Sequence, residues 1–443
     1  MAPTTITKAF ESLNIKKNFP EAPAIEGLRM LLERAAPVPK LVLRKRDGAF
    51  PTVEDEKRIT HQVALFEHGV GAEFNQYRLK LKTVLAELRK TVSRLFPDAK
   101  IWATGSFPAN VDLPTSDIDV TMEIPSLDGE PRKLSVIRAA MEGQGGPFQV
   151  KKIVGGRVPV LALMHKATKV PVDVTMDNGA PKRNTQLLIW YGQVDRRFVP
   201  LCRAIKSWAS QTGVENSMKG RLNSCSICLM VIHYLQCGVT PAVLPSLQAI
   251  FPELNGEIEI DCEESKRRDL GEELRASGWA PTNQESLGAL YLGFFRYFAK
   301  FDFINQMISV KNGCSMPKPK KNDEKDDTYA LRYTVIEDPF MNPLFNCART
   351  VNQGDIFERL VSEFEKALGF IKCHKTIFFQ KSFRRVLMER EGEERDMMDF
   401  NTINIPKDNW HGDKEKPSKF WNKKIQMMRC RFEEWPEQFQ GYP

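Results

Sequence analysis

Residues 100–120 read KIWATGSFPANVDLPTSDIDV, and this stretch decides the fold of the sheet-forming part of the chain. It opens with a short β-rich run that leads into Gly105 and Ser106. After ten intervening residues, Asp117 and Asp119 flank a single apolar residue. Because side chains alternate along a strand, we expect both carboxylates to project from one face and the residue between them to enter the core.

A third aspartate stands on a later strand-like segment, VPVDV, in which Asp173 lies among apolar residues. Carboxylates held side by side repel one another unless a cation lies between them, and hard oxygen ligands suit Mg²⁺ or the similar Mn²⁺. The aspartates therefore predict a divalent metal site. Such a site suits an in-line displacement with two ions, in which an attacking hydroxyl is activated and a leaving pyrophosphate is neutralised.

The glycine-serine pair adds a phosphate-binding feature. Glycine after a strand allows the backbone to approach a phosphate, and Ser106 offers a hydroxyl donor. Taken alone, an aspartate pair is a weak signal, since Asp112 or Asp117 can equally cap a turn. The ordered combination of strand, Gly-Ser, spacer, aspartate pair and later strand aspartate favours a nucleotide site.

Periodicity divides the chain into four parts. Apolar residues recur at helical spacing from Thr60 to Leu95, short β-rich segments follow as far as Met176, and helical patterns dominate after Asn178. We predict an α+β fold with a mixed sheet flanked by helices and a second, mainly helical domain. The predicted parts are an irregular arm (1–59), a catalytic domain (60–177), a helical domain (178–375) with a disordered loop near 312–328, and a basic and aromatic extension (376–443).

Composition limits the class of protein. No run approaches the ~20 apolar residues of a membrane span, and the N-terminus lacks the apolar core of a secretory signal. Nine scattered cysteines fit reduced thiols inside the cell, and the pair Cys225 and Cys228 is interpreted as core packing. The formal net charge of +8 suits a polyanionic partner.

The motif TGSFPANVDLPTSDIDV resembles that of the DNA-polymerase-β-like nucleotidyltransferase superfamily. Within it, the chain is similar to the RNA-tailing branch of GLD-type poly(A) polymerases and terminal uridylyltransferases. The likeness continues through GRLNSCSICLMVIHYLQ and VIEDPFMNPLFNCARTV and covers roughly residues 62–373. It implies that the helical part is a PAP-associated nucleotide-binding domain.

The resemblance also implies roles for individual residues. The metals would be held by Asp117, Asp119 and Asp173. The nucleoside triphosphate would be bound by Gly105, Ser106, Lys206 and Ser224 at the phosphates, by Asn178 or Asn184 at the ribose, and by Cys225, Asp338 and Asn346 near the base. Asp338 has an equally good structural account, because it can cap the turn before Pro339.

Three positions depart from the pattern of the family. Ser210 stands where a second phosphate-binding lysine is expected, and Cys225 stands where a tyrosine commonly stacks on the base. Phe345 precedes Asn346, where uridine-adding relatives carry a histidine. The resemblance therefore leaves the identity of the added nucleotide open.

The activity implied is addition of A, U or mixed U/G tails to the 3′ end of single-stranded RNA without a template, in RNA processing or RNA silencing. Because the sequence contains no recognisable RNA-binding module, we expect an RNA-binding or adaptor protein as a partner. The expected location is the cytoplasm, with or without association with granules, or the nucleus. Two alternatives stay open: an oligoadenylate-synthetase-like enzyme, and a catalytically silent scaffold with the same fold.

Overall fold

The computed structural model describes residues 50–114, 116–143, 146–156, 158–256, 268–276, 278–319, 333–341, 344–374 and 377. The predicted arm up to residue 49 and the predicted extension beyond residue 377 lie outside these residues. Among the described helices, none is both long enough and apolar enough to cross a membrane.

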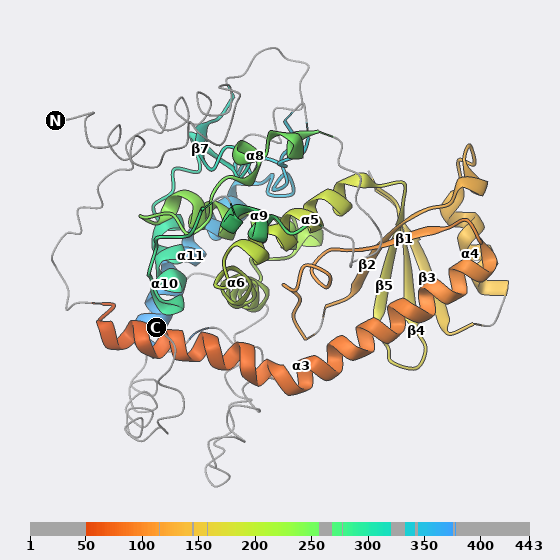
Figure 1. The fold of residues 1–443 in the computed structure, drawn as a ribbon, viewed down its shortest axis with the longest axis horizontal. Helices are drawn as coiled ribbons and strands as arrows, with labels where there is room; N and C mark the ends of the chain where they lie inside the picture. Colours follow the sequence, from red (N-terminus) through yellow and green to blue (C-terminus); the bar gives the residue numbers. More distant parts are fainter. Residues whose placement is uncertain are drawn as a thin grey trace, which may run out of the picture.

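The described elements begin with a long helix, continue as a sheet, and end as a group of helices (Figure 1). In chain order they are α3 (Val53–Leu95), β1 (Lys100–Thr104), β2 (Ile118–Glu123), η2 (Pro125–Leu127), α4 (Lys133–Gly143), β3 (Phe148–Val154), β4 (Val160–His165), β5 (Pro171–Met176), α5 (Gly179–Val194), α6 (Phe198–Thr212), η3 (Ser217–Lys219), α7 (Ser224–His233), η4 (Tyr234–Gly238), α8 (Leu247–Ile250), η5 (Pro252–Asn255), α9 (Leu270–Ala276), α10 (Leu287–Phe298), β6 (Gln306–Ser309), β7 (Cys314–Pro317) and α11 (Gly354–His374).

The main sheet has the strand order β1-β2-β5-β4-β3. Strands β2 and β5 are parallel, whereas the other neighbouring pairs are antiparallel, so the sheet is mixed. Its core joins alternate residues of the strands to the faces of α3 and α4, as with Val120 on β2, Leu88 on α3 and Ile137 on α4. The prediction of an α+β fold with a mixed sheet flanked by helices is confirmed.

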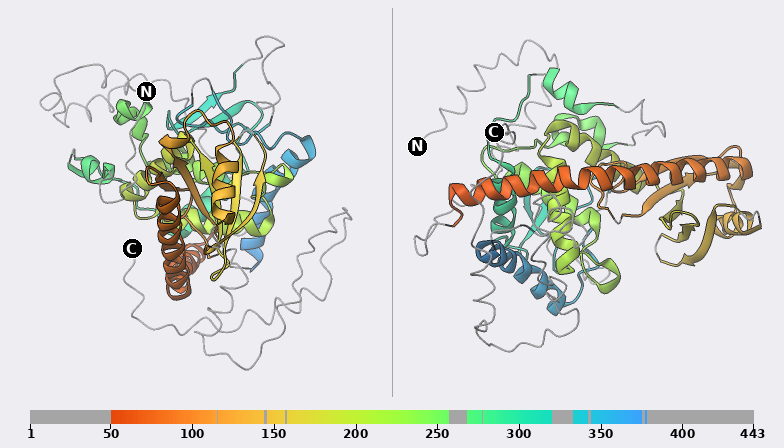
Figure 2. Two further views of the ribbon diagram at one scale, coloured as in Figure 1. Left: turned by 90° about the vertical axis from the view of Figure 1, so that its right-hand side faces the viewer. Right: turned by 90° about the horizontal axis from the view of Figure 1, so that it is seen from below.

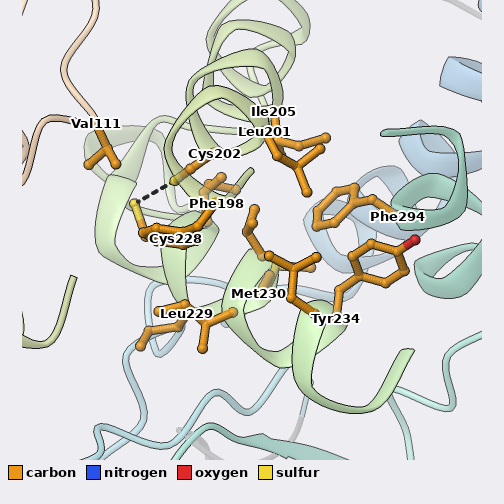
Figure 3. Packing of buried hydrophobic residues seen from close by; sticks show 14 of the residues in the cluster. Val111, Phe198, Leu201, Cys202, Ile205, Cys228, Leu229, Met230, Tyr234 and Phe294 are labelled. Atoms are coloured by element: carbon orange, nitrogen blue, oxygen red, sulfur yellow. Dashed lines mark hydrogen bonds between the residues drawn. The ribbon is translucent and has the colours of Figure 1, made fainter. Parts of the chain in front are cut away.

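A second core lies among the helices. Trp208 on α6 is fully buried and packs edge-on against Phe295 on α10, with ring centroids 5.0 Å apart. Figure 3 shows Cys202 on α6 facing Cys228 on α7, and their sulfur atoms are 3.5 Å apart. Both thiols are free and buried, which confirms core packing for Cys228, while Cys225 is half-buried.

The helix α3 belongs to both cores. Near its start, Ile59 and Phe66 are buried in the helical core, while Val84 and Leu88 further along are buried in the sheet core. Figures 1 and 2 show α3 running beneath the helical part and on to the sheet. The helix therefore fixes the position of one core relative to the other.

Two local predictions were wrong. The arm was expected to remain irregular to residue 59, yet α3 begins at Val53, because Thr52 and Asp55 form a reciprocal capping box. The loop predicted near 312–328 contains strand β7, which pairs with β6. Local hydrogen bonding outweighed the polar composition in both places, and residues 320–328 of that loop lie outside the described part.

Close contact between α10 and α3 generates a stability prediction. A Cβ at Gly288 would lie 2.1 Å from the Glu56 carbonyl oxygen. Gly288→Ala should therefore separate the two helices and lower the free energy of unfolding by about 1–3 kcal/mol. Urea denaturation measures this change.

The matched control is Gly369→Ala on α11, where an added Cβ meets nothing within 4 Å. This substitution should stabilise the protein by about 0.5–1 kcal/mol, because alanine favours helix more than glycine does. Equal effects of the two substitutions would contradict the packing argument.

Candidate active site

The three predicted aspartates meet at one place on the sheet. Asp119 on β2 lies directly opposite Asp173 on the parallel strand β5, and Asp117 stands one residue before β2. One carboxylate oxygen from each lies within 4.8 Å of those of the other two. Ile118 between them is fully buried, so the expected alternation of core and site residues holds.

Electrostatic repulsion marks this cluster as a cation site. Burial, followed by the charges of Asp117 and Asp173, raises the pKa of Asp119 to about 8. Burial and Asp117 also raise the pKa of Asp173. A divalent cation would relieve this repulsion, and an all-oxygen, partly exposed set of ligands fits a hard ion that keeps some of its water.

Gly105 is required by the position of Asp119. It adopts a φ of 77°, and an added Cβ would lie 2.3 Å from an Asp119 carboxylate oxygen. Its N–H donates to the Thr185 hydroxyl on α5 at 2.8 Å, which ties the start of the loop to the helical part. Ser106 follows in this loop, and its carbonyl accepts a hydrogen bond from Val111 at 3.0 Å.

Lys206 reaches the site from α6. Its side chain is buried, and its ammonium donates to the Val111 carbonyl at 3.0 Å. Its charge acts on Asp119 in the direction opposite to burial and the neighbouring carboxylates. The structure therefore places Lys206 beside both the loop and the acidic cluster, as its predicted role requires.

Ser224 lies beside Glu215, a residue that the sequence analysis missed. Ser224 is the first residue of α7, and its side chain is hydrogen-bonded to the Glu215 carboxyl. Burial raises the pKa of Glu215, and the charges of Lys206 and Asp117 both act on it. No motif pointed to Glu215, because only the fold brings it to the predicted phosphate-binding residues.

Among the residues predicted to contact the nucleoside, Asn184, Asp338 and Cys225 lie together. Asn184 donates to the Asp338 carboxylate at 3.2 Å, and the Cys347 sulfur is 3.8 Å from the same carboxylate. Cys225 is hydrogen-bonded to Cys347, so it joins this group. Asp338 also accepts from the Phe340 N–H at 3.0 Å, which supports its structural role in the turn as well.

Asn346 and Asn178 lie elsewhere. The Asn346 amide accepts from the N–H groups of Ile336 and Ala348, both at 2.9 Å, and donates to the Thr334 carbonyl at 3.0 Å. It holds the backbone of its own turn, and its contact with the nucleotide stays a prediction. Asn178 is the N-cap residue of α5, and its N–H lies 3.4 Å from the Thr121 hydroxyl.

Two family models match the chain. Residues 59–193 match "Poly(A) RNA polymerase, mitochondrial-like, central palm domain", and residues 286–342 match "Cid1 family poly A polymerase". The first match covers the sheet and the three aspartates. The second covers α10 and the segment that contains Asp338.

Curated relatives are poly(A) polymerases. The chain is 29% identical over 308 residues to poly(A) RNA polymerase GLD2-B of Xenopus laevis, covering 68% of this chain and 58% of that protein. It is 29% identical over 296 residues to poly(A) RNA polymerase gld-2 homolog A of Drosophila melanogaster, covering 65% of this chain and 21% of that protein. The chain thus spans less than two thirds of the length of either relative.

Solved structures share the fold. The Cid1 poly(U) polymerase bound to magnesium and 3′-dATP is 27% identical, with a TM-score of 0.56 over 67% of this chain and 89% of that one. Cid1 in complex with its short product ApU is 25% identical, with a TM-score of 0.55 over 67% of this chain and 88% of that one. These findings confirm the predicted nucleotidyltransferase fold and support binding of a divalent metal and a nucleoside triphosphate.

The acidic cluster predicts a response to metal ions. At a pH above about 8, where the Asp119 carboxyl is ionised, Asp119→Asn removes one of three mutually repelling charges, so the metal-free protein should unfold at a higher temperature than the wild type. Excess Mg²⁺ should raise the unfolding temperature of the wild type and have little effect on the variant. Differential scanning fluorimetry measures both shifts.

Asp128→Asn is the control, because the Asp128 side chain is 71% exposed and paired with Lys133. It should respond to Mg²⁺ as the wild type does. An Asp119→Asn protein that gains as much stability from Mg²⁺ as the wild type would exclude a metal site here.

Proposed function

We propose that this chain, which belongs to the RNA-tailing branch of the pol-β-like nucleotidyltransferases, adds ribonucleotides to the 3′ end of RNA without a template. The observation that carries the proposal is the meeting of Asp117, Asp119 and Asp173 on adjacent strands. Gly105 and Lys206 lie against this cluster, where a triphosphate would need contacts.

Different residues of the chain would bind the metal ions, the phosphates and the nucleoside. Asp117, Asp119 and Asp173 would hold divalent ions, which when bound lower the pKa of the RNA 3′-hydroxyl and neutralise the leaving pyrophosphate. Gly105 allows a phosphate to approach the backbone, while Lys206 and Ser224 would bind the phosphate oxygens. The part of the chain in α5, α7 and the segment near Asp338 would orient the nucleoside.

The proposal also names the metal ion and the residues that would contact the base. Mg²⁺ is the proposed ion, and Mn²⁺ has the same preference for oxygen ligands. Asp338, held by Asn184, is a candidate for reading the edge of the base. Cys225 offers no ring for stacking, and Phe345 replaces a histidine of uridine-adding relatives, so A, U or mixed U/G tails all fit the proposal.

Single-stranded RNA is the proposed acceptor. The structural relative Cid1 was solved with the product ApU, which supports this assignment. An RNA-binding or adaptor protein would supply the choice of target, with the location being the cytoplasm or the nucleus. The comparisons do not favour an oligoadenylate synthetase, and the three intact aspartates do not favour a silent scaffold.

Extension of a labelled single-stranded RNA tests the proposal. Purified protein with Mg²⁺ should extend the primer with one or more NTPs, supplied singly and together, and sequencing of the tail identifies the nucleotide. Asp119→Ala should reduce extension by at least about a thousandfold, since removal of a metal ligand removes several kcal/mol of transition-state stabilisation.

Asp128→Ala serves as the control and should retain wild-type extension, because the Asp128 side chain is 71% exposed, pairs with Lys133 and lies beyond the end of β2. Product made from ATP without a primer would favour the oligoadenylate synthetase. Absence of extension with every NTP, while a relative extends the same primer, would overturn the proposal.

Substitution of Glu215 is predicted to strengthen NTP binding rather than weaken it. Its carboxyl bonds to Ser224 and faces Lys206, so it competes with a triphosphate for both. Glu215→Gln should therefore lower KM for NTP by about three- to tenfold, equivalent to about 0.7–1.4 kcal/mol. Steady-state kinetics at saturating RNA measure the change.

Glu253→Gln is the matched control, because Glu253 is exposed and pairs with Arg268 on the surface. It should leave KM unchanged. A rise in KM for Glu215→Gln would instead mean that Glu215 supports the nucleotide through Ser224.

A further inference from the structure

The loop between β1 and β2 carries predicted site residues at both of its ends. Gly105 and Ser106 stand at its start, and Asp117 stands at its end. Its apolar side chains divide between the two cores: Phe107 is buried in the sheet core, whereas Val111 is buried in the helical core. The loop is therefore part of the contact between the two cores.

Two arginines hold the middle of this loop. Asp112 is fully buried, and its carboxylate lies 3.5 Å from Arg78 Nε on α3 and 3.7 Å from Arg203 Nη2 on α6. The Asn110 side-chain oxygen accepts hydrogen bonds from both arginines, that from Arg203 at 2.8 Å. Arg78 also donates to the Phe107 carbonyl at 2.9 Å.

This cluster stands directly beside Lys206. Val111, which lies between Asn110 and Asp112, provides the carbonyl that accepts the Lys206 ammonium at 3.0 Å. Asn110 has a φ of 59°, a left-handed conformation that orients the backbone at this point. Burial raises the pKa of Asp112, while the two arginines and Lys206 act against this rise. The buried Asp112 carboxylate thus lies within electrostatic reach of three cations.

The far end of the loop has a separate attachment. Tyr77 on α3 donates a hydrogen bond to the Ser116 carbonyl, immediately before Asp117. Within the loop, the Leu113 N–H donates to the Ser116 hydroxyl at 2.9 Å. Burial, with the charges of Asp117 and Asp112, raises the pKa of Tyr77 to about 12, so the phenol remains a donor at neutral pH. Two neighbouring residues of α3 therefore hold different parts of the loop: Arg78 holds its middle, and Tyr77 holds its end.

We propose that Asp112 is a positioning residue for the phosphate-binding half of the site, acting through Arg78, Arg203 and the Val111 carbonyl that holds Lys206. Tyr77 positions the other half, which carries Asp117. The inference rests on the proposed function for the roles of Lys206 and Asp117. It goes beyond that function by dividing the loop into two halves with separate kinetic effects.

The two halves are distinguished by KM and kcat. Asp112→Asn keeps the shape of the side chain and removes its charge, so Lys206 loses its fixed position. KM for NTP should rise by about tenfold, equivalent to about 1.4 kcal/mol, while kcat changes by less than about twofold. Tyr77→Phe should lower kcat by about tenfold and leave KM within about twofold.

The matched control is Asp195→Asn. Asp195 is also buried and pairs with an arginine, Arg197, but this pair lies between α5 and α6 and contacts Asn283 and Glu285 rather than the loop. The control should lower the unfolding temperature as much as Asp112→Asn does, with kcat and KM unchanged. A KM for Asp112→Asn that stays at the wild-type value, or a loss confined to kcat, would overturn the proposal.

If Asp112→Asn fails to fold, a second variant, Asn110→Gly, tests the same proposal. Glycine adopts the positive φ of Asn110 without strain and removes the amide oxygen that both arginines bind. KM for NTP should rise in this variant as well, and an unchanged KM would overturn the proposal. Calorimetric binding of a non-hydrolysable ATP analogue with Mg²⁺ should show the same loss of affinity even if the wild type extends no RNA, which separates failure of this inference from failure of the proposed function.

Discussion

The mutual repulsion of the carboxylates of Asp119 and Asp173, held side by side on parallel strands, is the constraint on which the site depends. The sheet core keeps these charges together, because neither strand can move without exposing residues such as Ile118 on β2 and Val172 on β5. The same constraint explains the glycine at position 105, since any side chain there would meet Asp119. Lys206, the cation beside this cluster, is held in place by the Val111 carbonyl.

Alternation along strands, the order of the motifs and the family resemblance together predicted the part of the site that lies on the sheet. Asp117, Asp119, Asp173 and Gly105 were identified because short-range geometry and the order of motifs determine their positions. Contacts between distant residues were not predictable in this way. Arg203 meets Asn110 across 93 residues of sequence, and no local pattern indicates this pairing.

Long-range pairing also limits what composition and resemblance can predict. Asn346 was assigned to the nucleotide through the resemblance, and the structure adds that its amide holds a turn whose other members are Thr334 and Ile336. Strand β7 was predicted as a disordered loop because its composition is polar, and only pairing with β6 makes it a strand. Composition and resemblance indicate which residues could bind a ligand, whereas long-range pairing decides which of their polar atoms are already hydrogen-bonded within the protein.

The helix α3 has a consequence for synthesis of the chain on the ribosome. The second half of α3 packs against the sheet, which follows it closely in the sequence. The first half packs against α10, and the contact between Thr60 and Gly288 spans 228 residues. At usual rates of elongation, that interval takes about 10 to 45 s. Until α10 is made, the apolar residues Ile59, Val63 and Phe66 lack part of the core that buries them in the folded protein, so the start of α3 completes its packing late in synthesis.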